Sequence, residues 1–354
     1  MALLFVDSFD HYKIGEMTKK WSSAGIFDEP GSIQVGTGRC GSNCYRQDFG
    51  YEVHRGVNPQ GTPTRGFCGF AYRNIQSLST TKIMGVSGTL FGDNPLWTAY
   101  FSASGAIDIH NGQAGQLLVA STPAGLIHQN EWAFLEFGWT IGRGTGAIIV
   151  RVNNIEVLNA TGLWLAGDPP GLLPWRAFLL TTSSNATNEY DDLYVLDDVD
   201  DGGSPPLNTF LGDVRIQYLR PIADGANTAW TVVGGGTHAN AVDKNYSSEL
   251  TTPSIQSNVV GATDTNEYDN PTIGVGLAFG VQVSALAVKD ESGPRTIATV
   301  VRAPSGATAI SASQAPSEGA STYRQTVYGR NPTTGAPWTI AEVSAAQFGV
   351  RVTG

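Results

Sequence analysis

Few residues in this sequence are suited to covalent cross-linking or metal binding. The 354 residues include three cysteines, an odd number that does not fit the paired framework of a small secreted disulfide scaffold. Cys40 and Cys44 form a Cys-x3-Cys pair without a neighbouring His or second Cys pair, which is poor spacing for zinc. We therefore expect Cys40, Cys44 and Cys68 to be either reduced structural thiols or members of disulfides formed in an oxidising final environment.

Long apolar runs are missing as well. No segment approaches the ~18 consecutive apolar residues that a membrane span needs. The N-terminal MALLFVD has neither the length nor the basic lead of a signal peptide. We expect a soluble protein that has no membrane partner and that its sequence does not direct to secretion.

Positive charge is scarce. Lys and Arg total 21 against 31 Asp and Glu, which gives a formal net charge of −10. Residues 1–203 hold 12 basic and 20 acidic residues, so most of the acidic excess lies there. Because such a chain repels phosphate backbones and has no Lys/Arg cluster, we predict no nucleic-acid partner.

The residues that are abundant favour an all-β protein. The chain has 43 glycines, many Thr, Val and Tyr, and apolar residues that alternate with period two. Residues 147–159 (AIIVRVNNIEVLN) predict a hairpin that turns at Asn153-Asn154. Residues 131–139 (EWAFLEFGW) predict a strand with Ala133, Leu135, Phe137 and Trp139 on one face. Strands spaced this closely indicate β-sandwich or jelly-roll domains.

The composition changes at residues 199–209 (VDDGGSPPLNT), which predict an acidic Gly/Ser/Pro linker. We expect a jelly-roll domain at 1–198 and a second β-sandwich domain at 210–354.

In the second part, strands are expected at 210–219 and in a hairpin covering 281–302, with a loop at 303–321. One short helix is predicted near the C-terminus, where Thr339 and Glu342 fit a capping box and Gly349 is the expected stop.

Catalytic motifs are not found. The five histidines are scattered, and neither a Gly-x-Ser-x-Gly elbow nor a phosphate-binding loop occurs. Glycoside hydrolysis needs two carboxyl groups on one side of a sugar, but Glu131 and Glu136 are five residues apart and face opposite sides of a strand. We expect Glu136 to be a rim or hydrogen-bonded residue, and we predict no catalytic residue, no bound metal and no cofactor.

Carbohydrate binding remains open on these residues. Sugar sites use exposed aromatic rings beside a few polar groups, and most tryptophans are instead core anchors. Trp97, Trp164 and Trp175 lie near Gly/Pro-rich loops and are the candidates for stacking on a glycan.

Several stretches together resemble a family of bacteriophage virion proteins. The first part, from LLFVDSFDHY through GFAYRNI, EWAFLEFGWTI and VRVNNIEVLNATG to YDDLYVLDD, resembles a concanavalin A-like (laminin-G-type) jelly roll. The second part, with FLGDVRIQYLRP, VQVSALAVKDESGPRTIATVVR and GAPWTIAEVSAAQFGVRV, resembles the domain that follows it in such proteins.

This resemblance implies a non-enzymatic virion component, a decoration, fibre or attachment part of the head or tail. It would be assembled in the host cytoplasm, contact other virion proteins and form a homo-oligomer such as a trimer or another ring. The alternative is an adsorption protein that recognises host surface polysaccharide. The cysteines in GRCGSNCYR (38–46) depart from the family pattern, so an intersubunit disulfide in the released particle is a further hypothesis.

An acidic stretch, NEYDDLYVLDDVDDGG (188–203), stands at the expected domain boundary. Residues 190–196 read as the closing strand of the first domain, and Asp197, Asp198, Asp200 and Asp201 as linker. A calcium site is the alternative, because neighbouring first and last strands would bring Asp7 or Asp10 near Asp191 and Asp192.

Overall fold

The structure is a computed structural model, and it describes residues 2–12, 17–23, 33–48, 52–57, 63–76, 80–89, 95–112, 117–166, 174–181, 186–243, 253–272 and 276–354. The chain folds into two compact units. Unit 1 comprises Met1–Gly202 and Pro206–Ile216, and unit 2 comprises Gly203–Pro205 and Gln217–Gly354. The described helices are short and nearly all regular structure is β-strand, which confirms the all-β prediction.

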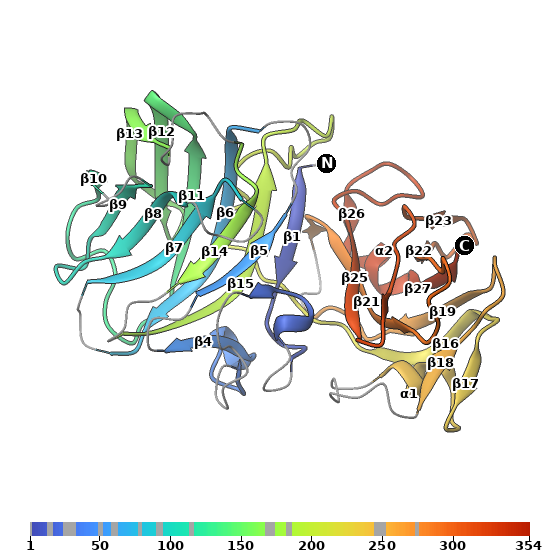
Figure 1. Ribbon diagram of the computed structural model, residues 1–354. Coiled ribbons are helices and arrows are strands. Elements are labelled where there is room, and N and C mark those ends of the chain that lie inside the picture. The colour runs from blue at the N-terminus through green and yellow to red at the C-terminus, as the bar shows by residue number, and fades with distance from the viewer. Residues whose placement is uncertain are drawn as a thin grey trace. The chain divides into compact units, whose positions relative to one another are not determined.

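Unit 1 is a sandwich of two antiparallel sheets (Figure 1). The first sheet has the order β13-β12-β11-β6-β15-β4-β3, with β1 paired to β15. Its strands are β1 (Leu3–Asp7), β3 (Ile33–Gln34), β4 (Cys44–Asp48), β6 (Arg65–Asn74), β11 (Ala133–Thr140), β12 (Gly142–Val152), β13 (Ile155–Leu165) and β15 (Thr187–Asp197). The pairing of β1 with β15 confirms that the first and last strands of this part are neighbours.

The second sheet of unit 1 has the order β10-β9-β8-β7-β14-β5-β2. Its strands are β2 (Ser22–Ser23), β5 (Glu52–Gly56), β7 (Thr81–Ser87), β8 (Pro95–Phe101), β9 (Ile107–Asn111), β10 (Leu118–Ser121) and β14 (Ala177–Thr181). Two 3-10 turns, η1 (Met17–Lys19) and η2 (Arg39–Gly41), lie between strands.

The core of unit 1 fills the space between the two sheets. Ala133, Leu135, Phe137 and Trp139 of β11 belong to this core, which confirms the face assigned to them by period-two alternation. The predicted hairpin is also confirmed, because β12 and β13 are joined by Asn153 and Asn154 with φ angles of 51° and 67°. Asn tolerates this left-handed conformation, which gives the turn the twist that flanking strands require.

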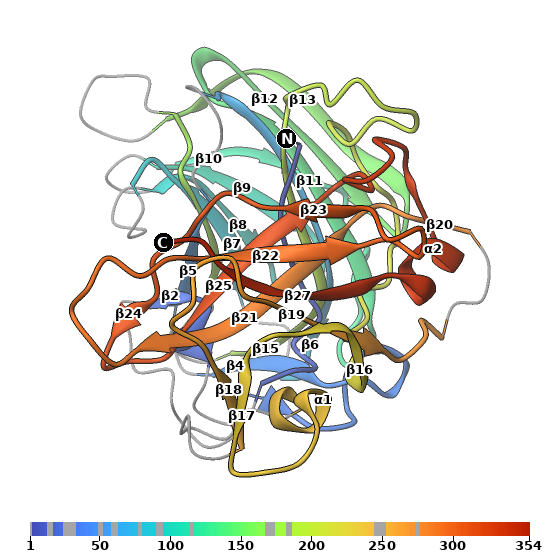
Figure 2. The same cartoon turned by 90° about the vertical axis from the view of Figure 1, so that its right-hand side faces the viewer.

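Unit 2 arranges its described strands in small sheets (Figure 2). The largest has the order β16-β19-β27-β22-β23, and the others are β17-β18, β20-β26 and β24-β21-β25. The strands are β16 (Pro221–Thr228), β17 (Thr231–Val233), β18 (Ser254–Gln256), β19 (Thr263–Tyr268), β20 (Leu277–Ala278), β21 (Val281–Lys289), β22 (Ile297–Arg302), β23 (Thr308–Ile310), β24 (Ser317–Glu318), β25 (Thr322–Tyr328), β26 (Trp338–Thr339) and β27 (Gln347–Val352). The helices are α1 (His238–Val242) and α2 (Ile340–Ala345).

Predictions for unit 2 hold for single elements and fail for their pairing. The Thr339/Glu342 capping box of α2 is present. However, α2 ends at its C-cap Ala346, and the expected stop Gly349 lies inside β27. The strands of the predicted 281–302 hairpin both form, but β21 pairs with β25 and β22 with β27. Residues 303–321, expected to be loop, contain β23 and β24.

Residues 210–219, predicted as a strand, contain no strand. Pro206–Ile216 belong to unit 1, where backbone amides of this segment bind side chains of the first sheet. The amide of Gly212 donates to Glu136 and the amide of Asp213 donates to Asn154, each at 2.8 Å. An alternating sequence forms no strand here because side-chain acceptors, rather than a neighbouring strand, satisfy its amides.

Candidate functional site

The three tryptophans predicted to stack on sugars lie in different environments. Trp97 and Trp175 have no exposed surface and belong to the core of unit 1. Neither ring can stack on a ligand from solvent, so the prediction is wrong for these two residues. Their rings pack in an aromatic cluster around Trp139, with centroids 5.6 and 5.1 Å from that ring. Trp164 is 39% exposed and is the one of the three that solvent reaches.

Trp164 lies near the end of β13 and pairs in register with Arg143 of β12. The Arg143 guanidinium lies over the indole, 5.3 Å from the ring centroid. A sugar ring stacked on such an indole would have N–H donors of a guanidinium beside it. Arg143 was not among the predicted site residues, although the register set by the Asn153-Asn154 turn places it opposite Trp164, because the irregularities between the two ends of the hairpin cancel.

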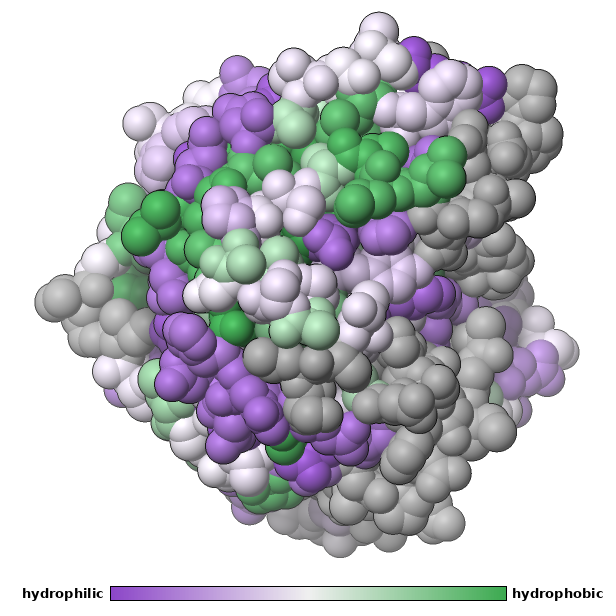
Figure 3. Space-filling model, turned by 90° about the vertical axis from the view of Figure 1, so that its left-hand side faces the viewer, coloured by the Kyte–Doolittle hydropathy of each residue, from purple (hydrophilic) through white to green (hydrophobic). Residues whose placement is uncertain are grey.

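Apolar side chains lie along the same edge of unit 1. Leu117, Leu118 and Ile155 are 59%, 56% and 67% exposed, and Val157, Leu158 and Leu163 are partly buried. Figure 3 shows hydrophobic surface gathered on this side, where β10 and β13 lie. We name this group of exposed residues, with Trp164, the β10/β13 edge.

The three cysteines are free thiols. Cys44 and Cys68 are buried, and burial raises the pKa of the Cys44 thiol to about 12 and that of the Cys68 thiol well above its usual value. Both thiols are therefore poor nucleophiles at neutral pH. Cys40 is exposed in the η2 turn, so the predicted intersubunit disulfide remains a hypothesis for this residue.

The acidic stretch is buried rather than solvated along most of its length. Glu189, Asp191, Asp192 and Asp197 are at most 1% exposed within β15. Asp197 was predicted to belong to the linker, but it lies in the strand, where its amide donates to the Ala2 carbonyl. The prediction of a closing strand at 190–196 is confirmed.

Asp191 and Asp192 hold two separate segments against β15. The Asp191 carboxylate accepts hydrogen bonds from the Arg39 amide and the Ser42 hydroxyl at 2.8 and 2.7 Å. Asp192 accepts from the Ile216 amide at 2.7 Å, and its second oxygen lies 3.5 and 3.4 Å from Arg39 and Arg215. The pair sits at a β-bulge, and Asp192 has a φ angle of +50°.

Burial, and then the charge of Asp192, raise the pKa of Asp191. Burial likewise raises the pKa of Asp192 despite its hydrogen bond and its two arginines. The negative charge of Asp10 also raises the pKa of both groups, which lie near Asp10 because β1 pairs with β15. The described residues contain no group of three or more His, Cys, Asp or Glu side chains arranged to hold a metal. The calcium site therefore stays a prediction, and no arrangement of ligands among the described residues supports it.

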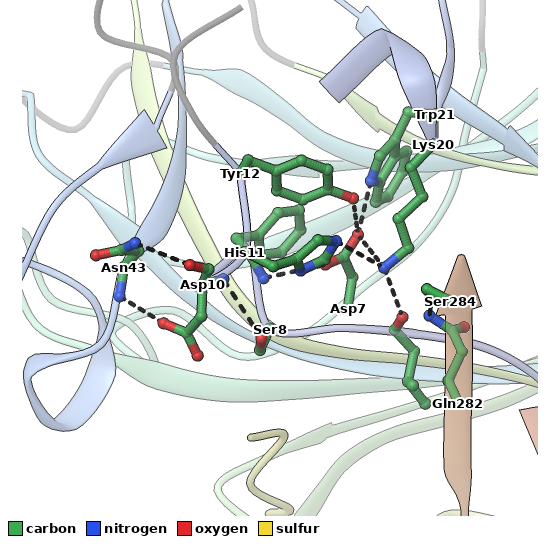
Figure 4. Close-up of polar contacts among 12 residues, drawn as sticks. Asp7, Ser8, Asp10, His11, Tyr12, Lys20, Trp21, Asn43, Gln282 and Ser284 are labelled. Atoms are coloured by element: carbon green, nitrogen blue, oxygen red, sulfur yellow. Dashed lines mark hydrogen bonds and ion pairs between the residues drawn. The ribbon is translucent and has the colours of Figure 1, made fainter. Parts of the chain in front are cut away.

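Asp7 lies in a different buried cluster, which sequence reasoning did not predict (Figure 4). Its carboxylate accepts hydrogen bonds from Tyr12 at 2.5 Å and Trp21 at 2.9 Å, and Lys20 Nζ lies 3.2 Å away. Burial lowers the pKa of Lys20 to about 8 and that of His11 to about 3. The cluster ties the segments around η1 to the end of β1, and the spacing of these residues gave no signal for it.

Glu136 is hydrogen-bonded, as expected. Its carboxylate accepts from the Tyr194 hydroxyl at 2.6 Å and from the Gly212 amide at 2.8 Å. Tyr194 packs over Gly69, where a Cβ would lie 2.4 Å from the ring. The Glu136 carboxylate is fully buried, and Pro206–Ile216 bind directly to it through the Gly212 amide.

No helix among the described residues combines the length and apolar character of a membrane span.

No protein-family model and no curated protein matches the chain. Among solved structures, the receptor-binding domain of a botulinum neurotoxin mosaic serotype C/D is 11% identical, with a TM-score of 0.35. That match covers 47% of this chain and 41% of the neurotoxin chain, so this chain spans under half of its length. A carbohydrate esterase of the Shiga toxin-encoding bacteriophage phi24B is 13% identical, with a TM-score of 0.36 and coverage of 55% and 100%. An alginate lyase is 13% identical, with a TM-score of 0.37 and coverage of 54% and 95%.

These matches overturn the prediction that the chain is not an enzyme. Structures partly similar to this chain include a carbohydrate esterase and alginate lyases, so resemblance to a sandwich of this kind does not exclude catalysis. At this identity and TM-score they assign the chain no activity. The chain is an all-β protein that is similar, over about half of its length, to jelly-roll and sandwich domains.

Proposed function

We propose that unit 1 binds carbohydrate and that the indole of Trp164, with the Arg143 guanidinium, is the contact surface. The observation that carries this proposal is the exposed indole paired with an arginine on an ordered strand. An indole face covers the apolar face of a sugar ring, while a guanidinium supplies donors to hydroxyl or carboxylate groups. Held by a β-hairpin, the pair needs little ordering on binding.

We further propose the biological setting that the sequence resemblance implies. The protein would be an attachment part on a bacteriophage particle and would recognise polysaccharide on the host surface. Antibody labelling of intact particles in electron micrographs tests the location: labelled heads or tails support it, and unlabelled particles contradict it.

Glycan binding is tested on a printed array of bacterial capsule and lipopolysaccharide chains. We expect Trp164→Ala to weaken binding about tenfold or more, and Trp164→Phe to retain part of it. The matched control is Trp132→Ala, which removes a less exposed indole that also packs under an arginine, Arg73 at 4.6 Å. Wild-type protein that binds no glycan, or binding that is lost in the control and kept in Trp164→Ala, would contradict the proposal. Release of shortened glycans from the array would reveal cleavage in addition to binding.

Protein–protein contact within the particle is the second candidate function. The exposed Leu117, Leu118 and Ile155 favour it, because contiguous apolar surface marks protein interaction sites.

A further inference from the structure

Among the described residues, β13 is an edge strand whose outer side pairs with no other strand. Within the described residues it pairs only with β12, and it is eleven residues long. Natural edge strands are usually short or carry Lys or Pro that block pairing with another chain. The sequence of β13, IEVLNATGLWL, contains no Lys, Arg or Pro. Gly162 has a φ angle of +74° and the β12–β13 register shifts along the strand, but no Lys, Arg or Pro blocks the outer side of β13, which pairs with no strand among the described residues.

Apolar side chains extend from this strand to the edge of the second sheet. β10 ends that sheet and contacts β13, so the two sheets of unit 1 finish side by side (Figure 1). Ile155 of β13 and Leu118 of β10 are more than half exposed. Both backbone and side chains at this edge thus favour a partner that brings a strand and apolar surface together.

The pattern of β13 is complementary to itself in the antiparallel direction. If a two-fold axis passes through Ala160, Val157 lies opposite Leu163, and Ile155 lies opposite Leu165. In the same register the exposed polar residues Asn159 and Thr161 face each other. These three pairs match apolar with apolar or polar with polar side chains, while Leu158 lies opposite Gly162 and Glu156 opposite Trp164.

The charges in this register are also complementary. Glu156, which is exposed, lies opposite Trp164, and Arg143 lies over the Trp164 ring. Glu156 of each copy would therefore approach Arg143 of the other, which creates the same ion pair twice. Within one chain the two residues cannot meet, because Arg143 pairs with Trp164 and Glu156 is eight residues away, about 26 Å along the strand.

We propose that two copies of this chain dimerise by antiparallel pairing of β13 with β13, on a two-fold axis at Ala160. This interface replaces the ring expected from the sequence resemblance with an isologous contact, in which both copies use the same surface. It goes beyond the proposed carbohydrate site but shares Arg143 with it, so a glycan and Glu156 of the other copy would compete for the same guanidinium.

The first test measures the mass of the full chain by sedimentation over a wide range of protein concentration. We expect a dimer for the wild type and a monomer for Thr161→Lys, because this change places a lysine beside the axis in both copies. Ser104→Lys, at an exposed turn between β8 and β9, is the control and should remain a dimer. Unchanged melting temperature and near-ultraviolet circular dichroism of Thr161→Lys would show that the fold is intact.

The second test is a charge exchange. Glu156→Lys or Arg143→Glu alone should raise the dimer dissociation constant about a hundredfold, since each change affects two symmetric ion pairs. The double variant should return it to within about tenfold of the wild type. A wild-type protein that is monomeric or trimeric, a Thr161→Lys variant that still dimerises, or a double variant no better than the single ones would overturn the proposal.

Discussion

Unit 1 encloses one large aromatic core between two sheets, whereas unit 2 divides its described strands among several small sheets around a smaller core. Among the described residues, the two units also differ in how many charges they bury, although unit 2 too buries a carboxylate, Asp264, beside His238. Unit 1 buries Asp7, Lys20, Asp191 and Asp192 completely or nearly so. Unit 2 keeps ion pairs such as Arg220–Asp243 and Arg295–Glu291 near solvent, with side chains 25–55% exposed. A deep interior makes buried charge feasible, but only where every charge has partners.

The largest expected effect comes from the aromatic cores. Trp139→Ala in unit 1 should reduce the free energy of unfolding by about 3–5 kcal/mol, because Trp97, Trp175 and other rings cannot close the cavity. Trp338→Ala in unit 2 should cost less, because the smaller core around it can relax further. Urea unfolding of both variants, followed by hydrogen exchange in each unit, tests this. Equal costs would show that core size does not distinguish the units.

The second-largest expected difference is between buried and exposed ion pairs, in the free energy of unfolding that is lost when one partner is removed. Asp7→Asn leaves the buried Lys20 without its anion and should cost about 3 kcal/mol. Asp243→Asn removes the partner of the exposed Arg220 and should cost less than about 1 kcal/mol. Adding Lys20→Met to Asp7→Asn should recover much of the loss, since no unpaired charge then remains. If thermal unfolding shows Asp7→Asn and Asp243→Asn to be equally stable, the prediction is wrong.

The smallest expected effect is a pH slope. The pKa values of Asp191 and Asp192 are raised in the folded protein, so the folded state holds protons that the unfolded chain has already released. Stability from this pair is therefore present at low pH and is lost as pH rises from about 4 through the raised pKa values. Each unit of pKa difference corresponds to about 1.4 kcal/mol.

Asp191→Asn should make the free energy of unfolding of unit 1 depend less steeply on pH and should leave the pH dependence of unit 2 unchanged. Unfolding measured at several pH values between 4 and 8 checks it. A variant whose stability varies with pH as steeply as the wild type would show that other groups cause the slope.

Local features of the sequence predicted much of the fold. Asn153-Asn154 fixed the β12–β13 turn because these residues tolerate positive φ, and Thr339 with Glu342 fixed the start of α2 because their side chains cap nearby amides. The alternation in β11 predicted which residues face the core. In each case the residues that decide the structure lie within a few positions of one another.

The candidate site could be predicted only in part. Trp164 was among the candidates, but its exposure, and the burial of Trp97 and Trp175, depend on how the sheets close over one another. Arg143 lies opposite Trp164 in the register that the Asn153-Asn154 turn sets, but that its guanidinium lies over an indole exposed to solvent is known only from the tertiary structure. The Asp7 cluster joins residues that follow no motif, because burial rather than spacing makes their partners obligatory.

The sequence by itself determined the all-β class, the turn at Asn153-Asn154 and the capped helix, since each follows from backbone preferences and side-chain period over short distances. Only the tertiary structure decided that β21 and β22 pair with other strands and that the acids of β15 are buried. It also decided that Pro206–Ile216 bind the first sheet without forming a strand. These outcomes depend on long-range pairing and desolvation, in which many segments of similar local pattern compete for the same partners.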